Sequence, residues 1–320
     1  MLLVSLQKKV RAGPDCGDET GHWKNGQWGT YDDVVPNDCH QLAAVRGTDV
    51  FWIEFDRTKG NPVTAVSKLY VLLCGYEILP RSVCLRGGGD RFVESVPVSA
   101  YLLETQQGFV LFDTGINADL VRNPALRHQH FTMHGWEPPV VWPQHELLTQ
   151  LQEIVIASED VSHVVLSHAH LDHTGNLRHF RNAKVWMQQS EYDFAFTGPA
   201  HPGVVRGDLD NPDLDWSLID GDHEMMPGLV LLSTAGHTPG HQSALISLPQ
   251  TGRALLVGDV GDWMANFEHE ILPGEASDDV AALESIRKIN RIRRDQDALM
   301  FVCHDPDLIQ KQKLAPDFYT

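Results

Sequence analysis

Short apolar runs separated by turn residues characterise the chain from Ser67 onward. Such runs are typical of buried strands, which have to bring apolar side chains to a core within a few residues. The runs predict strands at 69–74, 96–103, 109–112, 161–167, 229–233, 254–257 and 299–302.

Other segments have helical spacing instead. Residues 143–157 predict a helix with one apolar face, and residues 190–196 predict a short helix. From Asp278 to about Arg294 an apolar residue recurs every third position, which predicts a buried stripe, and Ser277 is a suitable N-cap. Strands followed by helices indicate a layered α/β fold. The residues of the stripe are Val280, Leu283, Ile286, Ile289 and Ile292.

Residues 1–66 differ in composition from the rest of the chain. They are rich in Gly, Asp, Asn and Trp and show little periodicity, apart from a strand expected at 50–55. We therefore divide the chain into an N-terminal extension, 1–66, and a main domain, 67–320. The extension is either partly ordered or a lid or dimer arm that packs Trp23, Trp28 and Trp52 near a site, and an arm would suggest a homodimer.

The charge of the chain excludes one large class of partners. Of 320 residues, 43 are acidic and 25 are basic, which gives a formal net charge of -18. Nucleic-acid binding requires clustered Lys and Arg, so no nucleic-acid partner is expected. The basic cluster between Arg287 and Arg294 lies on a predicted helix and is interpreted as its solvated face.

Cysteine usage and hydropathy indicate the compartment. The five cysteines are odd in number and no pair has CxxC spacing, so neither a disulfide framework nor a thiolate zinc site is expected. Reduced thiols are typical of the cytosol. The apolar start of the chain is too short for a signal sequence, and no apolar run approaches membrane-spanning length. We expect a cytoplasmic protein with no membrane partner.

The strongest chemical signal is at residues 167–173, which read Ser-His-Ala-His-Leu-Asp-His directly after an apolar run. If the strand ends in a loop here, His168 and His170 point one way, whereas Asp172 and His173 turn toward a neighbouring point. The segment then supplies ligands to two adjacent cations. Imidazole nitrogen and carboxylate oxygen suit Zn²⁺, with Mn²⁺, Co²⁺ or Fe²⁺ as substitutes.

This pattern resembles the histidine signature of the metallo-β-lactamase superfamily, and further segments continue the match in order. The resemblance extends from about Ser67 to the C-terminus and implies an αββα sandwich. Cys-His-Asp at 303–305, followed by Pro-Asp-Phe-Tyr at 316–319, resembles the lactonase branch, which includes N-acyl-homoserine lactonases. The further segments are Leu-Phe-Asp-Thr-Gly at 111–115, Thr-Ala-Gly-His-Thr-Pro-Gly-His at 234–241, Val-Gly-Asp at 257–259 and Phe-Val-Cys-His-Asp at 301–305.

The resemblance implies a set of metal ligands, each taken from its place in a motif. One cation is expected to bind three histidines and the other an aspartate and two histidines, with Asp259 between them, which would hold the ions about 3.5–4 Å apart. His241 is interpreted as a packing residue and Asp113 as a partner that fixes a ligand tautomer. The expected ligands are His168, His170 and His237 at the first site and Asp172, His173 and His304 at the second. Surface or loop roles in an irregular segment are expected for His128, His130 and His134.

The implied activity is hydrolysis of a small lactone, with an N-acyl-homoserine lactone as one substrate. A metal-bridging hydroxide would attack the ring carbonyl, and Asp172 could carry a proton to the leaving group. Quorum-quenching lactonases of this type usually carry a Tyr three residues after the bridging Asp, whereas this chain has Asp262. Asp262 is therefore a candidate proton donor, if burial raises its pKa.

Other reactions fit the same ligands. A lactam, a cyclic carbamate or an organophosphate also presents a polarised oxygen, and Trp142, Trp263 and Phe267 are candidates to line a pocket for an aromatic substrate or to be ordinary core residues. An iron-dependent oxidoreductase on the same fold is the alternative from another class of enzyme. It predicts iron and colour in the purified protein.

Overall fold

The computed structural model describes residues 40–46, 49–55 and 64–320, with side chains for 64–320. Strand β2 (Asp49–Phe55) contains the strand expected at 50–55, and it pairs antiparallel with β1 (His40–Arg46). Trp23 and Trp28 lie outside the described residues. The lid or dimer arm therefore stays a prediction.

A six-stranded mixed sheet forms the first half of the main domain. Its strands follow the order β3-β4-β5-β6-β7-β8, with antiparallel pairing from β3 to β5 and parallel pairing from β5 to β8. The strands are β3 (Val66–Pro80), β4 (Val93–Thr105), β5 (Gly108–Phe112), β6 (Val161–Val165), β7 (Lys184–Gln188) and β8 (Asp215–Ile219).

A five-stranded sheet forms the second half. Its order is β13-β12-β11-β10-β9, and only the pair of β12 and β13 is parallel. The strands are β9 (His223–Met226), β10 (Leu229–Ser233), β11 (Gln242–Leu248), β12 (Gly252–Leu256) and β13 (Leu299–Phe301).

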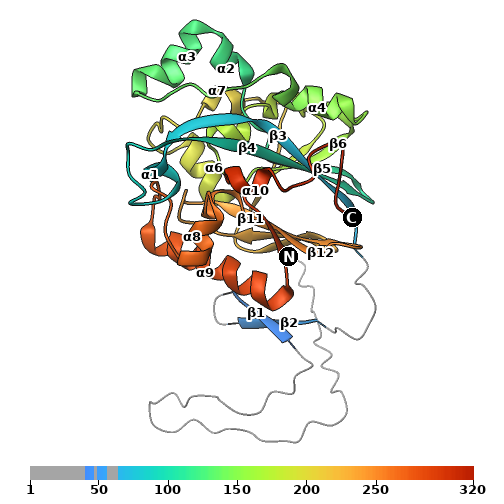
Figure 1. Ribbon diagram of the computed structural model, residues 1–320. Helices are drawn as coiled ribbons and strands as arrows, with labels where there is room; N and C mark the ends of the chain where they lie inside the picture. Colours follow the sequence, from blue (N-terminus) through green and yellow to red (C-terminus); the bar gives the residue numbers. More distant parts are fainter. Residues whose placement is uncertain (1–39, 47–48, 56–63) are drawn as a thin grey trace, which may run out of the picture. The chain divides into compact units, whose positions relative to one another are not determined.

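Alternation along the strands builds three cores. Side chains of a strand point to opposite faces in turn, so Leu69 and Val71 pack between the two sheets, whereas Tyr70 and Leu72 pack on the outer face of the first sheet. The outer face of the second sheet packs against α8 (Met264–His269) and α9 (Asp279–Gln296). Figure 1 shows the cyan strands β3 and β4, the orange strands β11 and β12, and α8 and α9 beyond them. The αββα sandwich implied by the resemblance is confirmed.

Helices cover the first sheet as well, and two expectations there were wrong. The segment expected to be irregular forms α2 (Ala118–Arg122) and α3 (Pro124–His130), because the Asn123 side chain caps α3 and Pro124 suits its first turn. The helix expected at 143–157 is only α4 (Leu147–Glu153), preceded by a 3₁₀ turn at Pro143–His145. The remaining helices are α1 (Arg81–Cys84), α5 (Leu171–Thr174), α6 (Gln189–Phe196), α7 (Arg206–Leu209) and α10 (Pro306–Ile309).

Helix α9 begins one residue later than expected. Asp278, not Ser277, is its N-cap, and its carboxylate accepts hydrogen bonds from the backbone N–H groups of Val280 and Ala281. The Ser277 hydroxyl instead donates to the carbonyl of Gly236 at 3.0 Å. Val280 is 69% exposed, because a three-residue repeat turns back by about 60° per step on an α-helix and leaves the buried face.

The Ser277 contact ties α9 to the loop that follows β10. The backbone N–H of Asp278 also donates to the Gly236 carbonyl, and that of Ser277 donates to the His237 carbonyl, both at 3.0 Å. Gly236 has a φ of +137°, and a Cβ at this position would overlap the backbone nitrogen of Ala282. The loop therefore requires glycine for two independent reasons.

We predict that Gly236→Ala lowers the free energy of unfolding by about 3 kcal/mol or more, through backbone strain and overlap with α9. Gly207→Ala is the matched control, because Gly207 lies in α7 and a methyl group added there would have no heavy atom within 4 Å. Its effect should stay within about 1 kcal/mol. Denaturant unfolding of both variants measures the difference, and equal stabilities would contradict this account of the loop.

Candidate metal centre

The predicted ligands lie where strands of both sheets end. His168 and His170 follow β6, and Asp172 and His173 lie in α5. The other ligands come from three segments of the second sheet: His237 follows β10, Asp259 lies in a 3₁₀ turn after β12, and His304 follows β13. Each sheet thus supplies part of the site, and the two sheets have to be packed before the site exists.

The structure brings the first group of ligands together. His168, His170, His237 and Asp259 offer ligand atoms that all lie within 4.8 Å of one another. The Nε2 atoms of His168 and His237 are both 3.5 Å from Asp259 Oδ2, and His237 Nε2 is 3.0 Å from His170 Nδ1. Nitrogen atoms that converge on one carboxylate oxygen are what a cation site requires.

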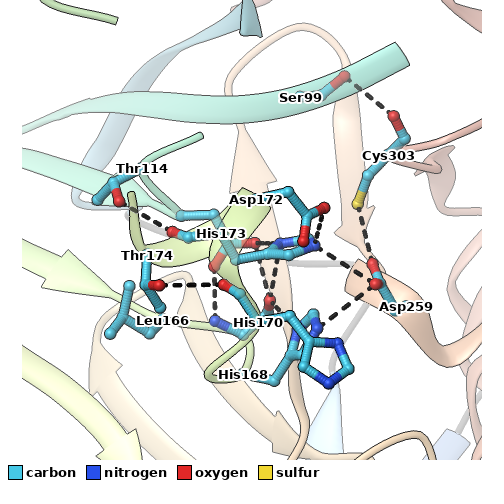
Figure 2. Close-up of polar contacts among 12 residues, drawn as sticks. Ser99, Thr114, Leu166, His168, His170, Asp172, His173, Thr174, Asp259 and Cys303 are labelled. Carbon is cyan, nitrogen blue, oxygen red and sulfur yellow. Dashed lines mark hydrogen bonds and ion pairs between the residues drawn. The ribbon is translucent and has the colours of Figure 1, made fainter. Parts of the chain in front are cut away.

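The second group shares Asp259. Asp172, His173, His304 and Asp259 also lie within 4.8 Å of one another through their ligand atoms. His173 Nε2 is 2.9 Å from Asp172 Oδ2 and 3.3 Å from Asp259 Oδ2, and His304 Nε2 is 3.3 Å from Asp259 Oδ1. Figure 2 shows His168 and His173 linked to Asp259, with the Cys303 thiol donating to Asp259 Oδ1 from the other side at 3.7 Å.

Asp113 orients one ligand and the loop that carries two others. It lies after β5 with a φ of +62° and is fully buried. Its Oδ1 accepts from the Ser167 backbone N–H at 2.7 Å, and its Oδ2 lies 2.8 Å from both the Ser167 hydroxyl and His173 Nδ1. A proton on His173 Nδ1 leaves Nε2 free to face a cation, as expected for a residue that fixes a ligand tautomer.

His241 stands outside both ligand groups, as expected. Its Nε2 accepts a hydrogen bond from the Asp259 backbone N–H at 2.9 Å, so Nδ1 carries the proton that points to the Thr234 hydroxyl, also 2.9 Å away. Gly258 has a φ of +59°, and a Cβ there would press against His241 Nε2. His241 thus positions the turn that presents Asp259.

Glu191 is a buried residue at the centre that sequence reasoning missed. Its side chain, on α6, accepts from the backbone N–H of Ala169 through Oε1 and from that of Gly240 through Oε2, each at 2.9 Å. One carboxylate therefore joins the loop of His168 and His170 to the loop of His237. No sequence motif around Glu191 indicates this contact, because both hydrogen-bond partners are backbone groups at distant positions in the chain.

The charges of the centre are arranged for cations. Burial raises the pKa of Asp259, but His173, His304 and His168 outweigh it and hold that pKa well below its usual range. Burial also opposes a charge on His304, yet Asp259 and Asp172 raise its pKa to about 10. Without bound cations, protons on His173 and His304 balance the carboxylates. Metal binding has to displace those protons.

A buried polar atom without a hydrogen-bond partner indicates whether the two ligand groups suit bound cations. Within residues 64–320, His168 Nε2 is a buried atom without a hydrogen-bond partner, and it faces the Asp259 carboxylate. A buried nitrogen without a partner costs free energy, and a cation between nitrogen and carboxylate removes that cost. The donor set of imidazoles and carboxylates therefore fits two divalent ions.

A cavity of about 320 Å³ opens onto both ligand groups. Besides the ligands, four acidic residues line it. They are Glu77 on β3, Glu137, Asp262 after the Asp259 turn, and Glu275. Burial, with Asp172 and Asp259 nearby, raises the pKa of Glu77 to about 8, and burial with Asp259 raises the pKa of Asp262 well above its usual range. Asp262 was expected from the sequence. Glu77 was not, because it lies in a strand without a motif.

The aromatic residues of this cavity differ from the three candidates that the sequence offered, of which Phe267 takes the alternative role of a core residue. Phe131 and Trp136 line the cavity. Phe267 packs in the core behind the second sheet, and Trp142 is 53% exposed on the surface. Trp263 is also absent from the cavity wall. Of the other histidines, His128 and His134 are exposed on α3 and the turn that follows it, which confirms their surface role.

Comparison with known proteins identifies the class. The family model of the metallo-beta-lactamase superfamily matches residues 94–304. The chain belongs to this superfamily. A curated N-acyl homoserine lactonase from a Bacillus species is 32% identical over 253 residues, which are 79% of this chain and 99% of that relative. Such a match places the chain in the lactonase branch of the superfamily.

Solved structures agree with this assignment. A variant of Bacillus thuringiensis AiiA with N-decanoyl-L-homoserine bound at its active site is 30% identical, with a TM-score of 0.73 over 80% of this chain and all of that chain. An N-acyl homoserine lactone hydrolase with N-hexanoyl-L-homoserine bound at its catalytic metal centre gives the same identity, TM-score and coverage. No helix in the described part of this chain is long and apolar enough to cross a membrane.

We predict that Asp113→Asn weakens metal binding by about 10- to 100-fold, because Asn keeps the shape of the contact with His173 but loses its charge. Asn also tolerates the left-handed backbone at this position, so the fold should persist. Asp119→Asn, on the exposed face of α2, is the control. Competition with a chromophoric chelator measures affinity. Unchanged affinity in a folded Asp113→Asn protein would remove Asp113 from the metal centre.

Proposed function

We propose that the protein is a metal-dependent lactonase that opens the ring of a small lactone, with N-acyl-homoserine lactones as substrates. The observation that carries the proposal is the pair of ligand groups that share Asp259 at the base of a cavity with an apolar wall. The relatives with bound acyl-homoserine products support the same substrate class.

We propose Zn²⁺ for both cations. The side chains that would hold them are His168, His170 and His237 on one side, Asp172, His173 and His304 on the other, and Asp259 between them. Nitrogen-rich sites of this kind suit Zn²⁺, although Mn²⁺, Co²⁺ and Fe²⁺ accept the same ligands. When bound, the cations supply Lewis acidity and allow water to act as a nucleophile at neutral pH.

The remaining steps fall to residues of the chain. Asp172 lies in the cavity wall beside His304. There its carboxylate can accept a proton and then donate it to the leaving oxygen of the ring. Asp262 lines the same wall and is 7% exposed. Its raised pKa favours the neutral acid, which can donate a hydrogen bond to the oxygen that gains charge as the ring opens.

Two further proposals concern the cellular compartment and the oligomeric state of the protein. Within residues 64–320, Cys74, Cys84 and Cys303 are free thiols, which supports a reducing compartment such as the cytoplasm. The homodimer that an N-terminal arm would form stays a prediction.

The proposal is tested by titrating the acid that ring opening releases. We expect the purified protein to hydrolyse N-acyl-homoserine lactones, to lose this activity after chelation and to regain it with Zn²⁺. The panel should include simple γ- and δ-lactones, a β-lactam, a cyclic carbamate and an organophosphate. Turnover of the last three alone would contradict the lactonase assignment, and iron with oxygen consumption would indicate an oxidoreductase.

We predict that Asp262→Ala lowers kcat/KM for lactones about 100-fold, because a hydrogen-bond donor to the developing oxyanion is lost. Asp262→Asn should retain much of the activity, since its amide N–H still donates. Asp262→Tyr should also be active, because related lactonases use a phenol three residues after the bridging Asp. Steady-state kinetics at constant metal loading decide the matter. Full activity in Asp262→Ala would exclude this role.

A further inference from the structure

The cavity wall next to the second ligand group has an unusual charge. Among the described residues that line the cavity, none is Lys or Arg, and four acidic residues, Glu77, Glu137, Asp262 and Glu275, add to the ligands Asp172 and Asp259. Asp262 has a hydrogen-bond partner in the Cys84 thiol. The Glu77 carboxyl forms no hydrogen bond or ion pair within residues 64–320, so its oxygens are free to accept one from a bound molecule.

Glu77 also stands at the boundary between two parts of the cavity. On one side, the ligands Asp172, Asp259 and His304 line the same cavity as Glu77, which brings its carboxyl toward the metal centre. On the other side, the next residues of β3, Ile78, Leu79 and Pro80, line the cavity as well. Val83, Val93 and Phe131 continue this apolar wall.

The sequence of metal centre, Glu77 and apolar wall determines where each part of a bound lactone can lie. A lactone whose carbonyl lies at the metal centre has its ring substituent at the adjacent carbon, and an apolar substituent is most stable against the apolar wall. The atom that joins ring and substituent then passes Glu77. A carboxyl oxygen there stabilises an N–H donor at that atom, whereas a methylene or an ether oxygen would leave the acceptor without a partner.

We propose that Glu77 determines substrate specificity by accepting a hydrogen bond from an N–H group on the ring carbon next to the lactone carbonyl, so that the protein prefers acylamino lactones. This proposal rests on the proposed lactonase function and adds a residue to it. A carboxylate in the same place of the substrate would meet like charges and no basic partner, so anionic substituents are disfavoured.

The test compares two lactones that differ at one atom. N-hexanoyl-homoserine lactone carries the N–H group, and its analogue carries a methylene in the same position with the same ring, ketone oxygen and tail. We expect the wild-type protein to prefer the amide by about tenfold or more in kcat/KM, because the analogue leaves the Glu77 acceptor without a partner. Glu77→Leu should reduce this preference to about twofold or less, mainly by losing activity on the amide.

Control variants separate recognition from folding. Glu77→Gln keeps a carbonyl acceptor and should retain part of the preference for the amide. If Glu77→Leu does not fold, a reduced preference in Glu77→Gln tests the role of Glu77 instead. Glu153→Gln removes one charge from the exposed face of α4 and should change neither substrate. The metal content of every variant should equal that of the wild-type protein.

The outcomes distinguish this proposal from the one on which it rests. Equal loss on both lactones in Glu77→Leu, or an undiminished preference in both Glu77 variants, would overturn the role of Glu77 while leaving the lactonase function intact. Wild-type turnover of both lactones without a preference would do the same. A wild-type protein that opens neither ring would overturn the lactonase function and the role of Glu77 together.

Discussion

The metal centre depends on the Asp259 carboxylate, which both ligand groups share. Its Oδ2 faces His168, His237 and His173, and its Oδ1 faces His304. A buried carboxylate is unfavourable unless charges or hydrogen bonds compensate for lost water. Here the neighbouring imidazoles hold its pKa well below the usual range despite burial. This compensation requires the ends of β6, β10, β12 and β13 to meet, so the chemistry depends on correct packing of the two sheets.

The loops that meet around Asp259 are held by groups that themselves bind no cation. Asp113 holds the loop after β6, Glu191 joins that loop to the one after β10, and His241 supports the Asp259 turn. Helix α9 fixes the β10 loop from outside through Gly236. Such contacts set the directions of the ligands before any cation binds, which lowers the cost of binding.

The structure brings together the ligand candidates that the sequence offered, most of which lie in short motifs directly after apolar strands. Sequence reasoning predicted the strands less completely. Strand β3 continues to Pro80, well beyond the expected end at 74, because pairing with β4 continues through Gly75, Tyr76 and Glu77, which interrupt the apolar run. Glu77 lies in this continuation, which is why no pattern revealed it. Val155 falls within the helix predicted at 143–157, but it is 90% exposed, because α4 ends at Glu153 and Val155 adopts a left-handed backbone.

Glu191 is a second functional residue that no sequence pattern could reveal. Its partners are the backbone N–H groups of Ala169 and Gly240. A sequence pattern does not indicate which distant backbone groups a side chain will bind. Buried polar residues that serve such contacts look like surface residues in a hydropathy pattern. Family resemblance named the candidate ligands, whereas only the packed structure reveals the residues that hold the loops of these candidates in place.

The most direct test of a shared-carboxylate centre is to count the cations and locate them. Elemental analysis of the wild-type protein, together with anomalous scattering from its crystals, should give two divalent ions per chain, about 3.5–4 Å apart with Asp259 between them. Asp259→Ala should lose the pair, whereas a control change on the exposed face of α9 should not. A single ion, or two ions retained without Asp259, would contradict the account.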